Sequence, residues 1–150
     1  MTQKIRAIIL NLLTRRDHSI LELTQKLRIK GHVTEEITAV IADLVQIGLI
    51  NESRFAENYI RWRTMKGYGP MRISQELQIR GIASEMIADQ LDITDNAWLT
   101  TVRKCWQKHF KSRIPTDFKQ RAKQMRFLQY RGFTREQIAS VFSQIAEFDE

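Results

Sequence analysis

The sequence predicts an all-α protein, an elongated and curved array of three tandem three-helix repeats, on three observations. Apolar residues recur at steps of three and four along the chain, as on one face of a helix, and no run alternates convincingly with period two. A short motif returns three times at nearly constant spacing. Only two prolines and six glycines interrupt 150 residues that are 43% hydrophobic, which argues against a disordered or collagen-like chain.

The recurring motif reads leucine, any residue, an apolar residue, a basic residue, glycine and then a usually apolar residue. Its copies occupy Leu27–His32, Leu77–Ile82 and Leu128–Phe133, so the glycines lie 50 and then 51 residues apart. Such spacing is typical of tandem copies of one supersecondary unit. Because each glycine follows a basic residue, we expect it to end a helix in the left-handed conformation, with the cation at the negative end of the helix dipole.

The apolar steps mark nine helices, three in each predicted repeat. In residues 1–50 they run from Ile5 to Leu13, Ile20 to Leu27 and Ile37 to Val45; in residues 51–95 from Phe55 to Trp62, Ile73 to Leu77 and Ile87 to Leu91; and in residues 96–150 from Trp98 to His109, Phe118 to Leu128 and Ile138 to Ile145. A three-helix unit of about fifty residues is marginally stable alone. We therefore expect neighbouring repeats to pack into one continuous array with a concave binding face.

Capping residues support these helix starts. Ser19 with Glu22, and Thr134 with Gln137, match the capping box, in which a hydroxyl and a side chain three residues later satisfy the first free N–H groups. Further predicted N-caps are Thr34, Ser84 and Thr116, and Pro70 stands where a first helical turn accepts proline.

The net charge of +7 is unevenly distributed. Residues 1–50 carry +2, residues 51–100 carry −1 and residues 101–150 carry +6. A basic surplus in one third of the chain favours a polyanionic partner, although a solvated basic face would have the same composition. The single cysteine, Cys105, excludes an internal disulfide and fits a reducing compartment, and no apolar run reaches the roughly eighteen residues of a membrane span. We expect a cytoplasmic monomer without membrane contact.

No arrangement of residues predicts catalysis, a metal site or a bound cofactor. The three histidines are scattered, and neither HxxxH nor CxxC spacing occurs. We interpret His32, which stands where the other repeats have Ile82 and Phe133, as a packing residue, and Cys105 as a buried thiol. Gly67–Pro70 lacks the lysine and serine of a Walker loop and the third glycine of a dinucleotide site, so it is a helix connector, a contact loop or both.

Two groups of cations supply the candidate contact residues. Residues 101–135 hold eleven lysines and arginines against one acid, and two stripes there share the helical spacing i, i+4, i+7. The stripes are Lys104, Lys108 and Lys111, and Lys119, Lys123 and Arg126. Like charges at this spacing mildly destabilise a helix, which favours a polyanionic partner as their explanation. The second group surrounds the Gly67–Pro70 connection.

In that second group, cations are interleaved with Trp62 and Tyr68, and rings beside cations are a general means of holding single-stranded nucleic acid. Trp62 shares a helical face with Phe55 and Tyr59 and is interpreted as a core residue, so Tyr68 is the predicted exposed ring. No helix carries an obvious base-reading set, and we expect contacts mostly to phosphate. The full candidate set is Arg61, Arg63, Lys66, Tyr68, Arg72, Arg103, Lys104, Lys108, Lys111, Lys119, Lys123, Arg126 and Arg131.

Three stretches of the chain resemble the RecX family of recombination regulators. One is Gly48–Ala56 followed by Lys66–Ile73 and Glu76–Leu77; another is Arg16–Ser19 with Leu23 and Lys26–Leu27; the last is Arg126–Leu128 with Arg131–Phe133. The resemblance covers nearly the whole chain. It departs at Asn51–Glu52, where many members have paired aspartates, and at Ile20–Leu21, where an acidic residue is common.

The resemblance implies tandem three-helix repeats, and also a function that the residues alone do not indicate. Members of the family bind the RecA recombinase, especially its filament on single-stranded DNA, and lower filament growth, strand exchange, ATP hydrolysis and co-protease activity. It thus implies a non-catalytic negative regulator of RecA in homologous recombination, DNA repair and the SOS response. Two other classes stay open: a free-standing helix-turn-helix-like DNA-binding protein, and a structural helical adaptor without DNA affinity.

Overall fold

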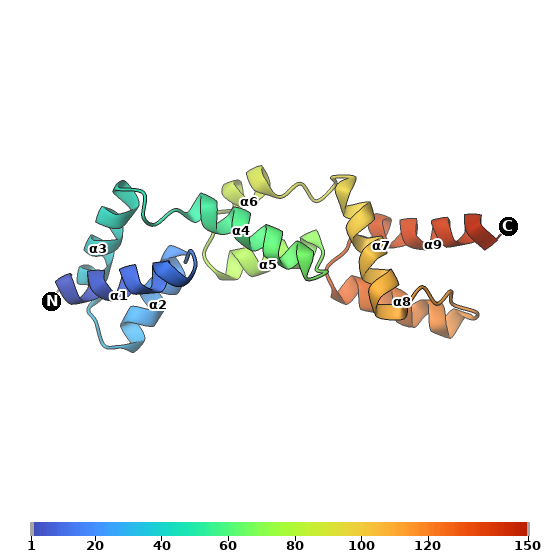
Figure 1. Ribbon diagram of the computed structural model, residues 1–150, viewed down its shortest axis with the longest axis horizontal. Helices are drawn as coiled ribbons and strands as arrows, with labels where there is room; N and C mark the ends of the chain where they lie inside the picture. Colours follow the sequence, from blue (N-terminus) through green and yellow to red (C-terminus); the bar gives the residue numbers. More distant parts are fainter. Residues whose placement is uncertain (1, 150) are drawn as a thin grey trace. The chain divides into compact units, whose positions relative to one another are not determined.

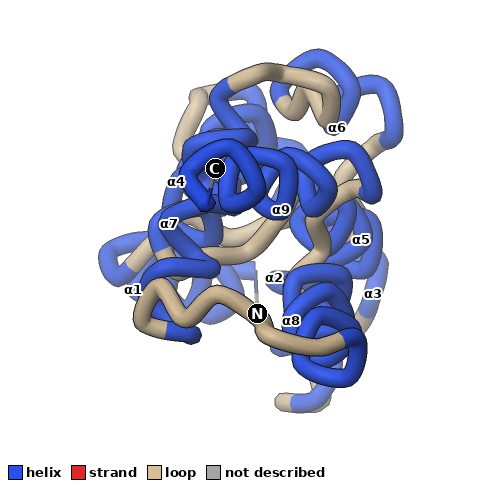
Figure 2. The backbone as a smooth tube through the Cα atoms, turned by 90° about the vertical axis from the view of Figure 1, so that its right-hand side faces the viewer, coloured by secondary structure: helices blue, strands red, loops and turns tan. Residues whose placement is uncertain are grey.

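Helices account for all the regular secondary structure described here. The computed structural model describes residues 2–149, with side chains as far as residue 146. These residues form nine α-helices and no strand (Figures 1 and 2). The helices are α1 (Thr2–Arg15), α2 (Ile20–Ile29), α3 (Thr34–Gln46), α4 (Glu52–Met65), α5 (Pro70–Ile79), α6 (Ser84–Gln90), α7 (Ala97–Phe110), α8 (Phe118–Tyr130) and α9 (Arg135–Asp149). The all-α prediction and the nine predicted helices are confirmed.

The described chain divides into two compact units. The first unit comprises the chain up to Tyr59 together with Leu77–Gln90, and it contains α1, α2, α3 and α6. The second unit comprises Ile60–Glu76 together with the chain from Leu91 onward, and it contains α7, α8 and α9. The division passes through α4 and α5. Repeat boundaries at residues 50 and 95 stay a prediction. None of the helices in residues 2–149 is long and apolar enough to span a bilayer.

In the first unit, α1 and α2 pack on α3 (Figure 1). The buried cluster takes one apolar face from each helix: Ile5 and Ile9 from α1, Leu23 and Leu27 from α2, and Ile37, Val40, Ile41 and Leu44 from α3, with Ile50 beyond it. These are the three- and four-residue steps visible in the sequence, because only residues at such steps share one side of a helix.

In the second unit, α7 packs on α8 and α9. Trp98, Val102 and Trp106 bury one face of α7. The indole N–H of Trp106 donates to Oε1 of the buried Gln124 at 2.8 Å, and Nε2 of Gln124 donates to the carbonyl of Arg113 at 2.9 Å. These bonds satisfy both polar ends of the amide, which would otherwise be costly to bury.

The repeated motif ends the second helix of each predicted repeat in the same way. Its glycines have φ of +92°, +83° and +100°, in the left-handed region that glycine adopts without strain. In each copy the glycine N–H donates to the carbonyl three residues earlier, and the next N–H donates to the carbonyl of the motif leucine, five residues back. This is the Schellman helix end, and the leucines that anchor it, Leu27, Leu77 and Leu128, are fully buried.

Two capping predictions are confirmed. Ser19 and Glu22 form a capping box, and Thr134 and Gln137 exchange the equivalent pair of hydrogen bonds.

The other three capping predictions are wrong by one residue. Thr34 and Ser84 are the first residues of α3 and α6 and not the residues before them. The N-cap of α8 is Asp117, next to the predicted Thr116: its carboxylate accepts the Gln120 N–H at 2.7 Å. A charged acceptor is favoured at this position by the positive end of the helix dipole.

Candidate functional site

Tyr68, in the loop between α4 and α5, lies among three arginines of the second unit. The guanidinium carbons of Arg63, Arg72 and Arg131 lie 3.7, 4.6 and 4.8 Å from the centre of its ring. Cations are attracted to the electron-rich face of an aromatic ring. We call these four residues the Tyr68 cluster; each of them is half-buried. All four belong to the set predicted from the sequence, and α4, α5 and the end of α8 bring them together.

Glu76, on α5, pairs with two arginines of the cluster. Arg63 donates from Nε and Nη2 to its two carboxylate oxygens, each at 2.8 Å. Such a bidentate pair holds the planar guanidinium in one orientation. Arg72 donates from Nε to the same carboxylate at 3.5 Å. Glu76 carries one negative charge against the three positive charges of the cluster, which therefore keeps a surplus that suits an anion.

Backbone contacts join the Tyr68 loop to the end of α8. Arg72 donates to the carbonyl of Tyr130 at 3.3 Å, and Arg131 donates to the carbonyl of Lys66 at 3.3 Å. The N–H of Gly69 donates to the carbonyl of Arg131 at 2.7 Å. The loop and the helix end therefore hold the arginines from both sides.

Gly69 is required here by close approach of the two backbones. A Cβ atom at this position would lie 2.5 Å from the carbonyl carbon of Gly132 and 2.6 Å from the amide nitrogen of Phe133. Gly67–Pro70 is thus a helix connector whose shape positions the Tyr68 cluster, which is one of the two interpretations that the sequence left open. Whether the loop also contacts a partner stays a prediction.

The two aromatic residues of this region, Trp62 and Tyr68, differ in exposure from the prediction. Trp62 is 51% exposed, whereas Tyr68 is half-buried among arginines. Helical spacing placed Trp62 on the face of Phe55 and Tyr59, and those two residues are buried as expected. That face is buried only along the earlier part of α4, so Trp62 on its last turns stays exposed beside Arg63, whose guanidinium carbon lies 5.3 Å from the indole.

The predicted lysine stripes lie on the surface of the second unit. The exposed members of the candidate set are Arg61, Lys66, Lys104, Lys108, Lys111, Lys119, Lys123 and Arg126, and Arg103 is half-buried. None of the thirteen candidates is buried. Since the stripes lie beside apolar faces that are buried in the core, their charges point to solvent and are accessible to a polyanion.

Lys111 is a correction to the first stripe. The helix α7 ends at Phe110, and Lys111 follows it in the left-handed conformation with φ of +52°. It therefore leaves the helical line of Lys104 and Lys108. The left-handed conformation is strained for a lysine, whereas a glycine adopts it without strain.

This turn brings Lys111 beside α8. A hollow of about 470 Å³ is lined by His109, Phe110, Lys111, Arg113, Gln120, Lys123 and Gln124. One member of each stripe and Arg113 thus line one concave surface. The ring of His109 stacks on that of Phe127, with centroids 3.7 Å apart. The arrangement provides cations around a concave wall, which suits phosphate groups of a strand.

Among the side chains that the structure describes, which extend to residue 146, no three His, Cys, Asp or Glu residues are grouped to hold a metal ion. Cys105 is buried, as predicted, and burial raises the pKa of its thiol, although the charges of Arg131 and Lys108 oppose that rise. A thiol in this state is a poor nucleophile at neutral pH.

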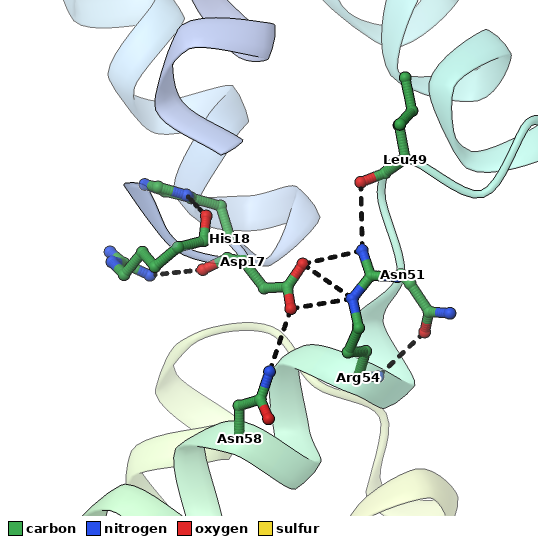
Figure 3. Close-up of polar contacts among 7 residues, drawn as sticks. Asp17, His18, Leu49, Asn51, Arg54 and Asn58 are labelled. Carbon is green, nitrogen blue, oxygen red and sulfur yellow. Dashed lines mark hydrogen bonds and ion pairs between the residues drawn. The ribbon is translucent and has the colours of Figure 1, made fainter. Parts of the chain in front are cut away.

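A polar network in the first unit joins the connection between α1 and α2 to α4 (Figure 3). Arg54 donates from Nε and Nη2 to the carboxylate of Asp17 at 2.9–3.0 Å, and Asn58 donates to it at 3.2 Å. Arg54 also reaches the carbonyl of Leu49 at 3.4 Å, while its backbone N–H donates to Oδ1 of Asn51 at 2.9 Å. This network holds segments together and is partly shielded from solvent.

Both departures from the family pattern lie in the first unit. Oε2 of Glu52 accepts the backbone N–H of Ile20 at 3.1 Å, so a carboxylate at residue 52 supports the start of α2. Leu21 packs against Gly81, where a Cβ atom would lie 2.8 Å from that of Leu21. One departure therefore takes part in a hydrogen bond and the other in packing.

The sequence interpretation did not identify three residues that position others: Asp17, Arg54 and Glu76. The signal was present, because all three lie inside the stretches that carry the family resemblance. Arg54 and Asn58 lie 37 and 41 residues from Asp17, and no local pattern indicates such pairs. Arg63 likewise lies 13 residues from Glu76, whereas the pair of Arg72 with Glu76 has the local spacing i, i+4.

Comparison with known proteins agrees with this architecture. Models of the first, second and third three-helix domains of RecX match residues 6–44, 51–91 and 99–142. The chain is 41% identical over 139 residues to the protein named "Regulatory protein RecX" of Pseudomonas fluorescens, covering 93% of this chain and 90% of that one. Over 149 residues it is 38% identical to the protein of the same name from Halorhodospira halophila, covering 99% and 92%.

Solved structures show the same fold. The crystal structure of RecX from Lactobacillus salivarius superposes with a TM-score of 0.78 at 20% identity, covering 97% of this chain and 96% of that one. A second structure, of a regulatory protein RecX, also gives a TM-score of 0.78 at 19% identity, covering 93% and 72%.

Proposed function

Because this chain belongs to the RecX family of regulatory proteins, we propose that it binds the RecA recombinase and its filaments on single-stranded DNA and limits their extension. In this proposal it lowers strand exchange, ATP hydrolysis and co-protease activity, and so modulates recombinational repair and the DNA-damage response. It acts in the cytoplasm as a monomer and performs no catalysis. The observation that carries the proposal is the match of all three family domains in order along the chain.

The second unit supports contact with the DNA of the filament. All thirteen candidate residues lie in it. The exposed lysines of α7 and α8 suit phosphate groups, and the half-buried arginines of the Tyr68 cluster keep a positive surplus beside a ring. Phosphate contacts of this kind give affinity without reading sequence.

In this proposal, regulation of RecA needs only a difference between the protein's affinity for free RecA subunits and its affinity for the filament. A protein that binds free subunits more tightly than the filament shifts the assembly equilibrium toward free subunits by mass action, and one that covers a filament end blocks the addition of further subunits. ATP hydrolysis by RecA falls because fewer active filament subunits remain. No group in the Tyr68 cluster has to form or break a bond.

The experiment measures ATP hydrolysis by RecA on single-stranded DNA as this protein is added at sub-stoichiometric ratio. We expect slower turnover and shorter filaments. The triple variant Lys104→Gln, Lys108→Gln, Lys111→Asn should inhibit more weakly; asparagine is chosen at residue 111 because it tolerates the left-handed conformation. The matched control removes three exposed cations of the first unit, Lys4→Gln, Arg6→Gln and Arg28→Gln.

No effect of the wild type at saturating concentration refutes the proposed function. Equal inhibition by the two triple variants shows that the α7 stripe is only a solvated surface. Salt titration of DNA binding distinguishes the alternative of a free-standing DNA-binding protein. About five phosphate contacts to a single strand give a log–log slope near −3.5, whereas strong sequence-specific duplex binding without RecA would favour the alternative.

A further inference from the structure

The third residue of the repeated motif is apolar in every copy and exposed in every copy. Ile29, Ile79 and Tyr130 expose 86%, 73% and 75% of their surface. They are the last residues of α2, α5 and α8, and the motif leucines two residues earlier are fully buried. We call these three residues the end residues.

The fold does not require an apolar side chain at this position. A step of two residues turns about 200° around a helix, so an end residue points away from the face that its motif leucine buries. Lysine, arginine and glutamine have higher helix propensity than isoleucine or tyrosine, and cations in a last turn also complement the helix dipole. The Schellman end itself uses the leucine and the residue after glycine, and not the end residue.

The backbone hydrogen bonds that follow each end residue are the same, whereas the side-chain surroundings differ: the Tyr130 ring lies 5.1 Å from the guanidinium carbon of Arg72. The N–H of the motif glycine donates over 2.9, 3.0 and 3.0 Å in the three copies, and the following N–H over 3.1, 3.1 and 3.3 Å. Single exposed apolar residues are normal on protein surfaces. An exposed aliphatic or aromatic residue at the same position of three copies of one helix end is a repeated surface feature.

We propose that Ile29, Ile79 and Tyr130 are contact residues for a protein partner built of identical subunits, each end residue entering an equivalent apolar hollow of a subunit. This rests on the proposed function, in which that partner is the RecA filament, and it adds which residues contact protein and not phosphate. A partner with a single site would use one copy and leave the other two without a role. Apolar side chains that become buried on binding are the usual anchors of such interfaces.

The experiment compares the triple variant Ile29→Gln, Ile79→Gln, Tyr130→Gln with a matched control, Val33→Gln, Ile47→Gln, Phe118→Gln. The control removes three exposed apolar residues that lie outside the repeated position. Inhibition of RecA ATP hydrolysis, binding to free single-stranded DNA and thermal unfolding are measured for both.

We expect the end-residue variant to need at least about tenfold more protein for half-inhibition, since each lost apolar contact contributes to the same interface. Its affinity for free single-stranded DNA should stay within about twofold of the wild type, because the substitutions remove no cation and Arg72 keeps its bonds to Glu76 and to the backbone carbonyl of residue 130. Its melting temperature should be unchanged, and the control should behave as the wild type in all three measurements.

The outcomes separate the two proposals. If the wild type does not inhibit RecA, both proposals fall. If the wild type inhibits and the end-residue variant inhibits equally well, this inference alone is wrong. It is also wrong if the variant loses DNA affinity in parallel with inhibition, which would mean that the end residues stack on bases. Three single variants complete the test: a loss confined to Tyr130→Gln would contradict repeated use of the position.

Discussion

Replacing Gly69 by alanine tests the close backbone contact between the Tyr68 loop and the end of α8, which positions the Tyr68 cluster. The new Cβ atom would lie 2.5 Å from the carbonyl carbon of Gly132, 2.6 Å from its oxygen and 2.6 Å from the amide nitrogen of Phe133. All three are backbone atoms, which cannot rotate away as a side chain would. The two segments must therefore move apart, which weakens the bonds from Gly69 N–H to the carbonyl of Arg131 (2.7 Å) and from Met71 N–H to that of Gly132 (2.9 Å).

The expected loss of stability is about 3 kcal/mol. Overpacking costs about 1–3 kcal/mol and each weakened hydrogen bond about 0.5–1.5 kcal/mol. For a chain of this size, 1 kcal/mol corresponds to about 2–4 °C, so the melting temperature should fall by about 6–12 °C. Gly31→Ala is the matched control: Gly31 has φ of +92° and nothing within 4 Å of an added Cβ, so only the strain of about 1 kcal/mol remains.

Circular dichroism melts of the two variants and the wild type check this difference. Hydrogen exchange at the Met71 amide gives a local readout, and its protection should fall in Gly69→Ala but not in Gly31→Ala. The reasoning is refuted if Gly69→Ala melts at the same temperature as Gly31→Ala or above it, because the backbones would then have room for the methyl group.

Three further outcomes are expected. Burial, aided by the cations Arg16 and Lys26, lowers the pKa of His18, although the hydrogen bond between His18 and the Arg16 carbonyl opposes the shift. The contribution of neutral His18 to stability is complete above the unfolded pKa of about 6.5 and is lost as pH falls toward the folded pKa. The melting temperature of the wild type should therefore decline more steeply below about pH 6.5 than that of His18→Gln. Glu76→Gln replaces the carboxylate that holds Arg63 and should cost about 1–3 kcal/mol in denaturant unfolding, whereas an unchanged midpoint would mean that the pair adds nothing to stability. Because burial raises the pKa of Cys105, its native thiol should react with an aromatic disulfide reagent far more slowly than the unfolded thiol at pH 8, and equal rates would contradict its burial.

Local features of the fold were readable from the chain alone. Which face of a helix is buried follows from residues three and four apart, so the buried residues of α1, α3 and α7 all fall on the predicted stripes, although Val45 and His109 at the ends of two stripes are exposed. The repeated glycines were recognisable as helix ends because a left-handed residue is a local requirement. The exposure of the lysines of α7 and α8 was likewise predictable, since a lysine is rarely buried without a partner.

Only the tertiary structure decided which of these segments meet. The sequence predicted Arg63 and Arg72 around the Gly67–Pro70 connection, but nothing in it placed Arg131 beside them. The three arginines converge on Tyr68 where a glycine at residue 69 lets two backbones approach. Trp62 keeps its helical spacing but not its burial, because periodicity gives the direction of a side chain and not what covers it. Contacts between residues tens of positions apart depend on packing energies summed over whole helices, and no local pattern records that sum.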